Sequence, residues 1–196
     1  MRALLGVFLI SLSAATLRAE TVKAVVDAVS GTVEFAPPGS GSFAPLKKGQ
    51  DLAVGSTIRT GDGSSAVITT TPGSVINLGA NSNLRLNALA FAKSGSSVTQ
   101  REAHLELSSG VVSALIDPST PKITDFQVQT PEGAAAARGT FYAVMVTHGK
   151  TYVSVEQGKV GALAATHHSL RFSLILKKAG PVGFFDWRLC RSVQSR

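Results

Sequence analysis

The sequence predicts an all-β domain of short strands and glycine turns, arranged as a sandwich or as a roll or solenoid-like stack. Short runs of alternating apolar and polar residues from Thr21 onward predict half-buried strands, and no long amphipathic helical pattern competes with them. The alanine-rich stretch 132–137 is too short to bury a helical face. The clearest strand runs are Val75–Leu78, Leu84–Leu86, Leu105–Leu107, Phe126–Val128 and Tyr152–Val155. The turn-forming pairs between runs are Pro38-Gly39, Asp62-Gly63, Pro72-Gly73 and His148-Gly149.

Residues 1–19 have the pattern of a secretory signal peptide. A charged start, Met1-Arg2, precedes an apolar stretch and then small residues that end at Ala19. The apolar stretch is shorter than the roughly 20 residues that a membrane span needs. We therefore expect cleavage near Ala19, a periplasmic or secreted mature protein, and no stable membrane span after cleavage. An uncleaved membrane anchor is the alternative that this segment leaves open.

The net charge of +7 does not lie in the presumed domain. Residues 20–165 carry 11 Lys and Arg against 11 Asp and Glu, so the excess lies at the two ends of the chain. Nucleic-acid binding usually needs cations clustered on a folded face together with stacking aromatics. We therefore expect no nucleic-acid partner. Cys190 is the single cysteine, so neither an intrachain disulfide nor a cysteine-pair metal site is predicted.

One local pattern, apolar-x-apolar-x-x-Gly-x-Val, occurs three times, with its glycine at Gly31, Gly110 and Gly158. Each copy predicts a strand, a glycine turn and a second strand, because glycine reaches positive φ without a Cβ clash. The spacings between the copies differ, so we expect three hairpin-like corners rather than a regular repeat.

A series of motifs runs through most of the body of the chain in a fixed order. They are Gly31-Thr32-Val33, Gly55–Gly61, Thr71–Leu78, Asn83–Leu86, Leu105–Val111, Thr130-Pro131, Arg138-Gly139-Thr140 and Val153–Val160. In order and spacing they resemble the FecR family from about Val22 to Val160.

This resemblance implies an all-β domain outside the cytoplasm. In the best-known members the domain follows a cytoplasmic anti-sigma segment and a membrane span, and it relays an iron-transport signal. Residues 1–19 are too few to hold such a regulator, so we expect a stand-alone, exported FecR-domain protein. Ala137 departs from the family, which commonly has a β-branched residue just before Arg-Gly-Thr.

The family motifs supply the candidate site residues, for which we expect structural roles. Arg59 and Arg138 would then bond loop carbonyls or an aspartate such as Asp62; the alternative is an arginine fork that binds an anion or a partner's carboxylate. Asp62 is expected in a turn, since a calcium site needs several acidic oxygens. We also expect positive φ at Gly61 and Gly139. The full set is Gly55, Arg59, Thr60, Gly61, Asp62, Gly73, Gly110, Arg138, Gly139, Thr140 and Gly158.

Catalysis finds little support. No histidine falls in a spaced metal motif, no serine lies in Gly-x-Ser-x-Gly, and the glycine-rich loops lack the lysine of a phosphate-binding loop. We therefore predict a non-enzymatic protein with no catalytic residue, cofactor or metal.

The predicted function is binding of an unknown partner or ligand in the cell envelope, in a sensory or scaffolding role. The alternatives are an enzyme that acts on envelope polymers and a structural subunit of an envelope assembly. A flat, exposed edge strand would favour binding or assembly. An ordered cleft with converging titratable groups would favour the enzyme.

The domain is expected to span residues 20–165, after which the sequence changes character. A last strand is expected at about 170–180, followed by a basic, disordered tail. Two other interpretations of Pro181–Arg196 stay open: a basic aromatic arm that contacts an anionic surface, and residues read from a shifted frame.

Overall fold

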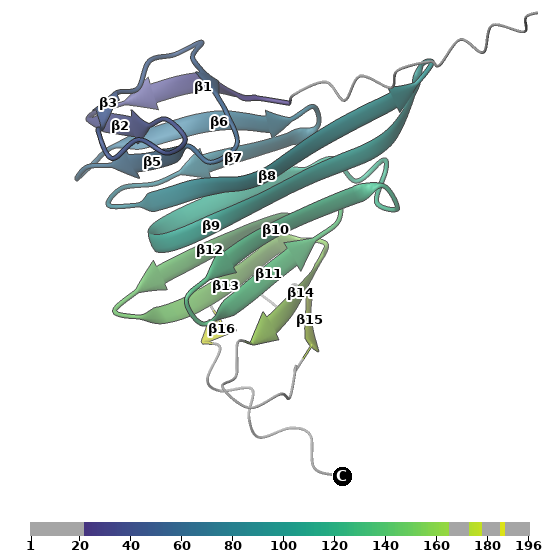
Figure 1. Cartoon of the computed structure of the whole chain (residues 1–196). Helices are drawn as coiled ribbons and strands as arrows, with labels where there is room; N and C mark the ends of the chain where they lie inside the picture. The colour runs from purple at the N-terminus through teal and green to yellow at the C-terminus, as the bar shows by residue number, and fades with distance from the viewer. Residues whose placement is uncertain (1–21, 165–172, 178–184, 187–196) are drawn as a thin grey trace, which may run out of the picture.

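The computed structural model describes residues 22–164, 173–177 and 185–186, and the elements within these ranges are strands joined by turns (Figure 1). The predicted all-β fold is confirmed. Among the described residues there is no helix of the length and apolar character that a membrane crossing requires. The predicted signal peptide and most of the predicted tail lie outside these ranges. Strand β15 falls within the range expected for the last strand.

The strands form two sheets that share one long strand. Sheet A consists, in spatial order, of β4 (Asp51–Leu52), β1 (Ala24–Ser30), β6 (Ser65–Thr71), β7 (Ser74–Leu78), β9 (Ser97–Ile116), β12 (Phe141–Thr147), β13 (Lys150–Gln157) and β16 (Phe185–Asp186). Sheet B consists of β3 (Ala44–Pro45), β2 (Val33–Ala36), β5 (Thr57–Thr60), β8 (Asn83–Ser94), β9, β10 (Thr124–Thr130), β11 (Gly133–Ala137), β14 (Lys159–Ala164) and β15 (Ser173–Lys177). Neighbouring strands are antiparallel, except that β9 and β10 are parallel.

The chain passes between the two sheets at glycine corners. Strands β1 and β2, which flank Gly31, pair with partners in different sheets, and so do β13 and β14, which flank Gly158. Gly110 lies inside β9, which pairs with β8 and β10 before this residue and with β7 and β12 after it. The expectation of hairpins at these three glycines is therefore wrong. A positive φ there bends the chain into the other sheet instead of reversing it.

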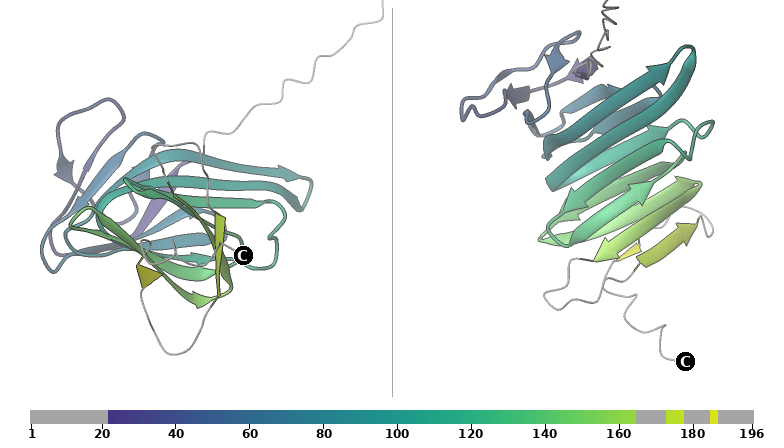
Figure 2. Two further views of the ribbon diagram at one scale, coloured as in Figure 1. Left: turned by 90° about the horizontal axis from the view of Figure 1, so that it is seen from below. Right: turned by 45° about the vertical axis from the view of Figure 1, so that its right-hand side comes forward.

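The two sheets face one another (Figure 2), and buried residues from both form one hydrophobic core. The buried positions of β9 have odd numbers up to Leu107 and even numbers from Val112 onward, which is the sequence trace of the bend at Gly110. Phe126 of β10 and Tyr142 of β12 meet edge to face, with ring centroids 6.3 Å apart and an interplanar angle of 89°. These two rings come from different sheets, so their contact holds the sheets together.

The alanine-rich stretch forms β11, which lies between β10 and β14 in sheet B. Ala135 and Ala137 are buried, with 2% and 3% of their surface exposed. Pairing on both edges fixes this stretch as a strand, so tertiary contacts override the helical preference of alanine. Ala137, the departure from the family pattern, is thus a small inward-facing residue.

Positive φ is found at Gly139, with φ of 69°, but not at Gly61, so the expectation for Gly61 is wrong. The turn after β5 has its positive φ at Gly63, with φ of 61°. The Gly61 N–H donates to the carbonyl of Thr32 at 2.9 Å, and the Gly61 carbonyl accepts from the N–H of Asn81 at 3.2 Å. Gly61 therefore continues the backbone pairing between neighbouring corners, and Gly63 makes the turn.

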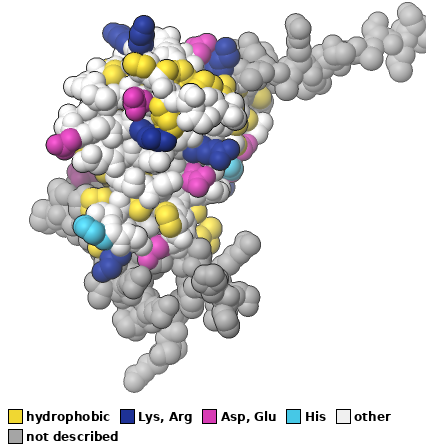
Figure 3. All heavy atoms as spheres, turned by 60° about the vertical axis from the view of Figure 1, so that its left-hand side comes forward, with side chains coloured by type: hydrophobic (Ala, Val, Ile, Leu, Met, Phe, Trp, Pro, Cys, Tyr) yellow, Lys and Arg dark blue, Asp and Glu magenta, His cyan; other side chains and the backbone are white. Residues whose placement is uncertain are grey.

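Both signs of charge are mixed on the face drawn in Figure 3, where no region of one sign gathers. This agrees with the balanced count of 11 cations and 11 anions over residues 20–165.

Candidate functional site

Strands β8 and β9 form a hairpin that projects beyond the neighbouring strands (Figures 1 and 2). β8 has 12 residues and β9 has 20, and their pairing runs from Asn83 opposite Ser109 to Ser94 opposite Ser97. Gly95 closes the turn with a φ of 59°. The two strands adjacent to this hairpin in sheet B, β5 and β10, are shorter, so the tip extends past them.

The outer edge of β8 is covered only near its start. β5 pairs with β8 over Asn83–Arg85, and the Gly55 N–H donates to the Leu86 carbonyl at 2.6 Å. Leu86 in turn donates to the carbonyl of Ser56 at 3.0 Å. Beyond Leu86, no strand within the described part of the chain pairs with this edge of β8. Residues 87–94 thus form an open strand edge.

This open edge carries an uncharged apolar run, Ala88-Leu89-Ala90-Phe91-Ala92, which ends at Lys93. A register shift between Leu86 and Ala88 changes which residues face the core. After the shift, Leu89 and Phe91 lie opposite the buried residues Ala103 and Arg101, so they face inward.

The alanines of the run face outward. Ala88, Ala90 and Ala92 lie opposite His104, Glu102 and Gln100, and the whole run is half-buried. An open edge whose side chains are small or apolar is a template for an added strand, because its unpaired N–H and C=O groups can bond to another chain.

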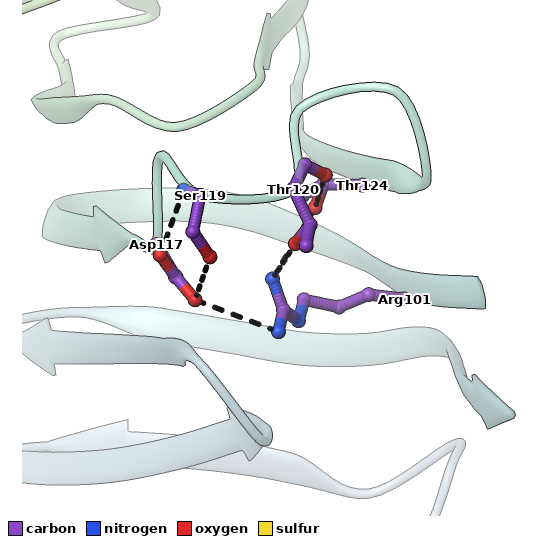
Figure 4. Close-up of polar contacts among 5 residues, drawn as sticks. All are labelled: Arg101, Asp117, Ser119, Thr120 and Thr124. Carbon is purple, nitrogen blue, oxygen red and sulfur yellow. Dashed lines mark hydrogen bonds and ion pairs between the residues drawn. The ribbon is translucent and has the colours of Figure 1, made fainter. Parts of the chain in front are cut away.

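The inner side of the hairpin holds a buried arginine, Arg101, beneath the loop between β9 and β10 (Figure 4). One guanidinium nitrogen, Nη1, donates to Thr120 Oγ1 at 2.8 Å and to Thr124 Oγ1 at 3.4 Å. The other, Nη2, lies 3.8 Å from Asp117 Oδ2. Gly73 packs against the guanidinium so closely that a Cβ there would lie 2.8 Å from the Arg101 Cζ.

Asp117 is bound more tightly to its own loop than to Arg101. Its carboxylate accepts the Ser119 N–H and the Ser119 hydroxyl, both at 2.8 Å. These two bonds are the main causes that lower the pKa of Asp117, and the charge of Arg101 contributes least. Because a lowered pKa favours the ionised form, Asp117 carries its negative charge at neutral pH.

Sequence reasoning missed both features, although each left a signal. Leu84 and Leu86 have even numbers and Leu89 and Phe91 have odd ones, and this change of phase marks the bulge in β8. Arg101 has an odd residue number, like the buried residues that follow it in β9, and this alternation indicates a side chain that faces the core.

Four of the predicted residues lie at three neighbouring corners: the corner after β5, the corner after β7 and the bend within β9. They are Thr60, Gly61, Asp62 and Gly110. Thr60 Oγ1 donates to the Gly79 carbonyl and accepts the Ser82 N–H at 2.9 Å. The Gly61 carbonyl bonds to the next corner as described above, and Gly110 packs against Ser82. Asp62 follows in the turn, where Asn81 Nδ2 lies 3.5 Å from its Oδ1. Their hydrogen bonds join corner to corner.

Arg59 lies elsewhere, on the outer face of β5. Its Cζ is 3.3 Å from the centroid of the Phe43 ring, and the expected contact with Asp62 is not formed in the structure. The side chain is exposed. Gly55, in the preceding turn, lies against Pro38. Gly73 belongs to the Arg101 cluster.

A second group of predicted residues lies at the corners before β12 and β14. Thr140 Oγ1 donates to the Lys159 carbonyl at 3.0 Å, and Gly158 packs against Thr140. Gly139 packs against Pro118. Arg138 is exposed, and its side chain forms no hydrogen bond or ion pair with a loop carbonyl or an acid within the described ranges. The predicted residues thus form separate corners and no single site.

His104 is flanked by two carboxylates on the outer face of sheet B. Its Nε2 lies 3.1 Å from Asp125 Oδ2, and its Nδ1 lies 3.6 Å from Glu102 Oε1. The carboxylates lie at opposite nitrogens, so the three groups do not converge on one point. Across residues 22–164, no group of three or more His, Cys, Asp or Glu side chains is arranged to hold a metal ion.

Comparison with known proteins identifies the family. The model of the FecR protein family matches residues 56–161, which is more than half of the 196-residue chain. The chain therefore belongs to the FecR family.

Two solved structures are similar to this chain. Both are crystal structures of a "putative anti-sigma factor" from Parabacteroides distasonis ATCC 8503, with 20% and 19% sequence identity and TM-scores of 0.41 and 0.40. Each match covers 62% of this chain, and this chain spans 58% of the solved one. No curated protein matches the chain significantly.

Proposed function

We propose that the protein is an exported, non-enzymatic FecR-domain protein that binds a partner protein in the cell envelope by strand addition, in a sensory or scaffolding role. Membership of the FecR family supports a sensory or regulatory role. The signal-peptide pattern of residues 1–19 supports export.

The open edge of β8 is the observation that carries the proposal. A partner segment that lies along residues 87–94 would bond to its free backbone groups, and main-chain bonds of this kind supply affinity. Specificity would come from alternate side chains. The outward alanines leave room for bulky residues of the partner, and Leu89 and Phe91 offer apolar contact from the inner face. The partner segment is therefore extended and mainly apolar.

The substitution Ala90→Lys tests this proposal. Ala90 lies at the centre of the apolar run and faces Glu102 across the hairpin, so a lysine there can pair with that carboxylate while the hairpin stays folded. A charged side chain in the middle of an edge strand opposes strand addition. We expect the tagged wild-type protein to retain a partner from envelope extract of its native host, and the Ala90→Lys variant to lose it.

Two control variants separate strand addition from general charge effects. Ala90→Val keeps the edge apolar and favours the strand, so partner recovery should persist. Ser96→Lys adds the same charge at the exposed turn of the same hairpin, outside the apolar run, and should also retain the partner. Equal recovery with Ala90→Lys and the wild type would refute binding at this edge. Recovery of only further copies of this chain would indicate a structural subunit instead.

A further inference from the structure

We propose that Arg101 is a binding site for a carboxylate group, and that Asp117 is the internal group with which this ligand competes. The proposal is independent of the β8 edge, because it concerns the inner side of the hairpin and the loop between β9 and β10.

The first observation is that the buried charge of Arg101 is incompletely paired. The side chain is 6% exposed, and its Nε has no hydrogen-bond partner within the described part of the chain. A buried guanidinium is favourable only when its donors are satisfied by good acceptors. Its only carboxylate neighbour in this region, Asp117, stands at 3.8 Å, which is beyond hydrogen-bond distance.

The second observation is a pair of unpartnered hydroxyls in the segment that packs against the guanidinium. Thr71 and Ser74 lie on either side of the Pro72-Gly73 turn, and Gly73 is the residue that packs against Arg101. Their hydroxyl oxygens are buried and form no hydrogen bond to described residues. Hydroxyls can donate to an anion, so the segment that contacts Arg101 contains free donors as well. A planar carboxylate matches the planar fork of a guanidinium, because its two oxygens can accept two parallel N–H bonds.

The third observation is a route from the surface. A shallow hollow beside the hairpin tip is lined by Val98, Ser119, Thr120, Pro121, Lys122 and Ile123. Thr120 lines this hollow and also accepts from Arg101 Nη1, so the hollow lies next to the arginine. Lys122, which is exposed, adds a second positive charge to the lining of this hollow. A carboxylate in the hollow would lie close to Lys122 and to Thr120, the hydrogen-bond partner of Arg101.

Asp117 is the internal carboxylate that already lies near Arg101. Its negative charge faces Arg101, while its two short bonds go to Ser119. An incoming carboxylate would therefore replace a long ion pair without breaking the hydrogen bonds that order the loop. Because both groups are negative, removal of the Asp117 charge should favour the ligand.

Sodium acetate is the probe, added to the full chain at pH 7 and at constant ionic strength maintained with sodium chloride. Binding is followed by NMR at the Arg101 Nε–H and the Ser119 backbone N–H. In the wild type we expect shifts that saturate. In Asp117→Asn, which keeps an acceptor for Ser119, we expect binding to tighten about fivefold or more, since a like charge within about 4 Å is removed.

Two controls make the result decisive. Asp51→Asn removes a charge of the same sign at an exposed position of β4 and should bind acetate as the wild type does. Arg101→Lys keeps the charge but lacks the guanidinium fork, and it should lose the saturating shift. A capped Gly-Asp-Gly peptide serves as a second probe. Tighter binding of the peptide than of acetate would identify a partner's acidic side chain as the ligand, and the reverse would identify a free carboxylic acid.

Shifts that stay linear in acetate and in peptide for both the wild type and Asp117→Asn would overturn the proposal. So would an equal affinity of Asp117→Asn and Asp51→Asn, because Asp117 would then not compete. In either case Arg101 would be a structural residue whose remaining donors are satisfied by solvent.

Discussion

Replacement of Gly139 by alanine is expected to lower the free energy of unfolding by about 3 kcal/mol or more. Gly139 has a φ of 69°, where an L side chain is strained. A Cβ built there would lie 2.5 Å from the Cα of Pro118. That atom belongs to the backbone, so the corner before β12 or the loop after β9 must move to accommodate one methyl group.

Gly61 provides the matched control for this prediction. It lies at the corresponding end of β5, but its φ is not positive, and the nearest atoms to an added Cβ lie 3.5 Å away on Thr32. Gly61→Ala should therefore change the free energy of unfolding by no more than about 1 kcal/mol. Urea denaturation of both variants measures the difference. Equal midpoints and slopes for the two would contradict the geometry of the corners.

The second large effect is expected at Phe126. Its replacement by alanine should lower the free energy of unfolding by about 3–5 kcal/mol. Its ring is 1% exposed and packs edge to face against Tyr142 of the other sheet. Loss of the ring leaves a cavity between the sheets, which a rigid pair of sheets cannot close.

Leu115→Ala is the matched control for this core substitution. Leu115 is 59% exposed on the outer face of sheet A, so its loss should change the free energy of unfolding by no more than about 0.5 kcal/mol. The same urea series measures both variants. A Phe126→Ala protein as stable as Leu115→Ala would show that the two sheets do not share the core described above.

The fold class followed from the sequence because strand periodicity and turn chemistry are local. The alternation in Phe126–Val128 and Tyr152–Val155 appears unchanged in β10 and β13. The positions of the glycine corners were predicted correctly, but their geometry was not, because hairpins were expected where the chain bends into the other sheet. Whether a positive-φ glycine reverses a strand or bends it into a second sheet depends on which distant strands pair with the flanking residues, and local sequence does not contain that information.

The candidate site was less predictable for the same reason. The open edge of β8 exists because β5 begins only at Thr57, which lies opposite Arg85 in the antiparallel pair, so within the described ranges the later residues of β8 have no strand beside them on this edge. That length difference between distant strands is a tertiary property. The family motifs point elsewhere, because residues such as Thr60 and Thr140 join neighbouring corners by hydrogen bonds. Motifs of this kind therefore indicate which residues stabilise the fold, and they do not indicate which residues bind a partner.

Hydrogen exchange along residues 87–94 tests the account most directly. In the free protein, about every second amide of this stretch should exchange rapidly, because alternate N–H groups of an antiparallel strand point away from its single neighbour. Addition of the partner recovered with the wild-type chain should protect these amides and leave those of the Gly95 turn unchanged. Uniform protection of residues 87–94 in the free protein, or unchanged exchange in the complex, would contradict strand addition at the β8 edge.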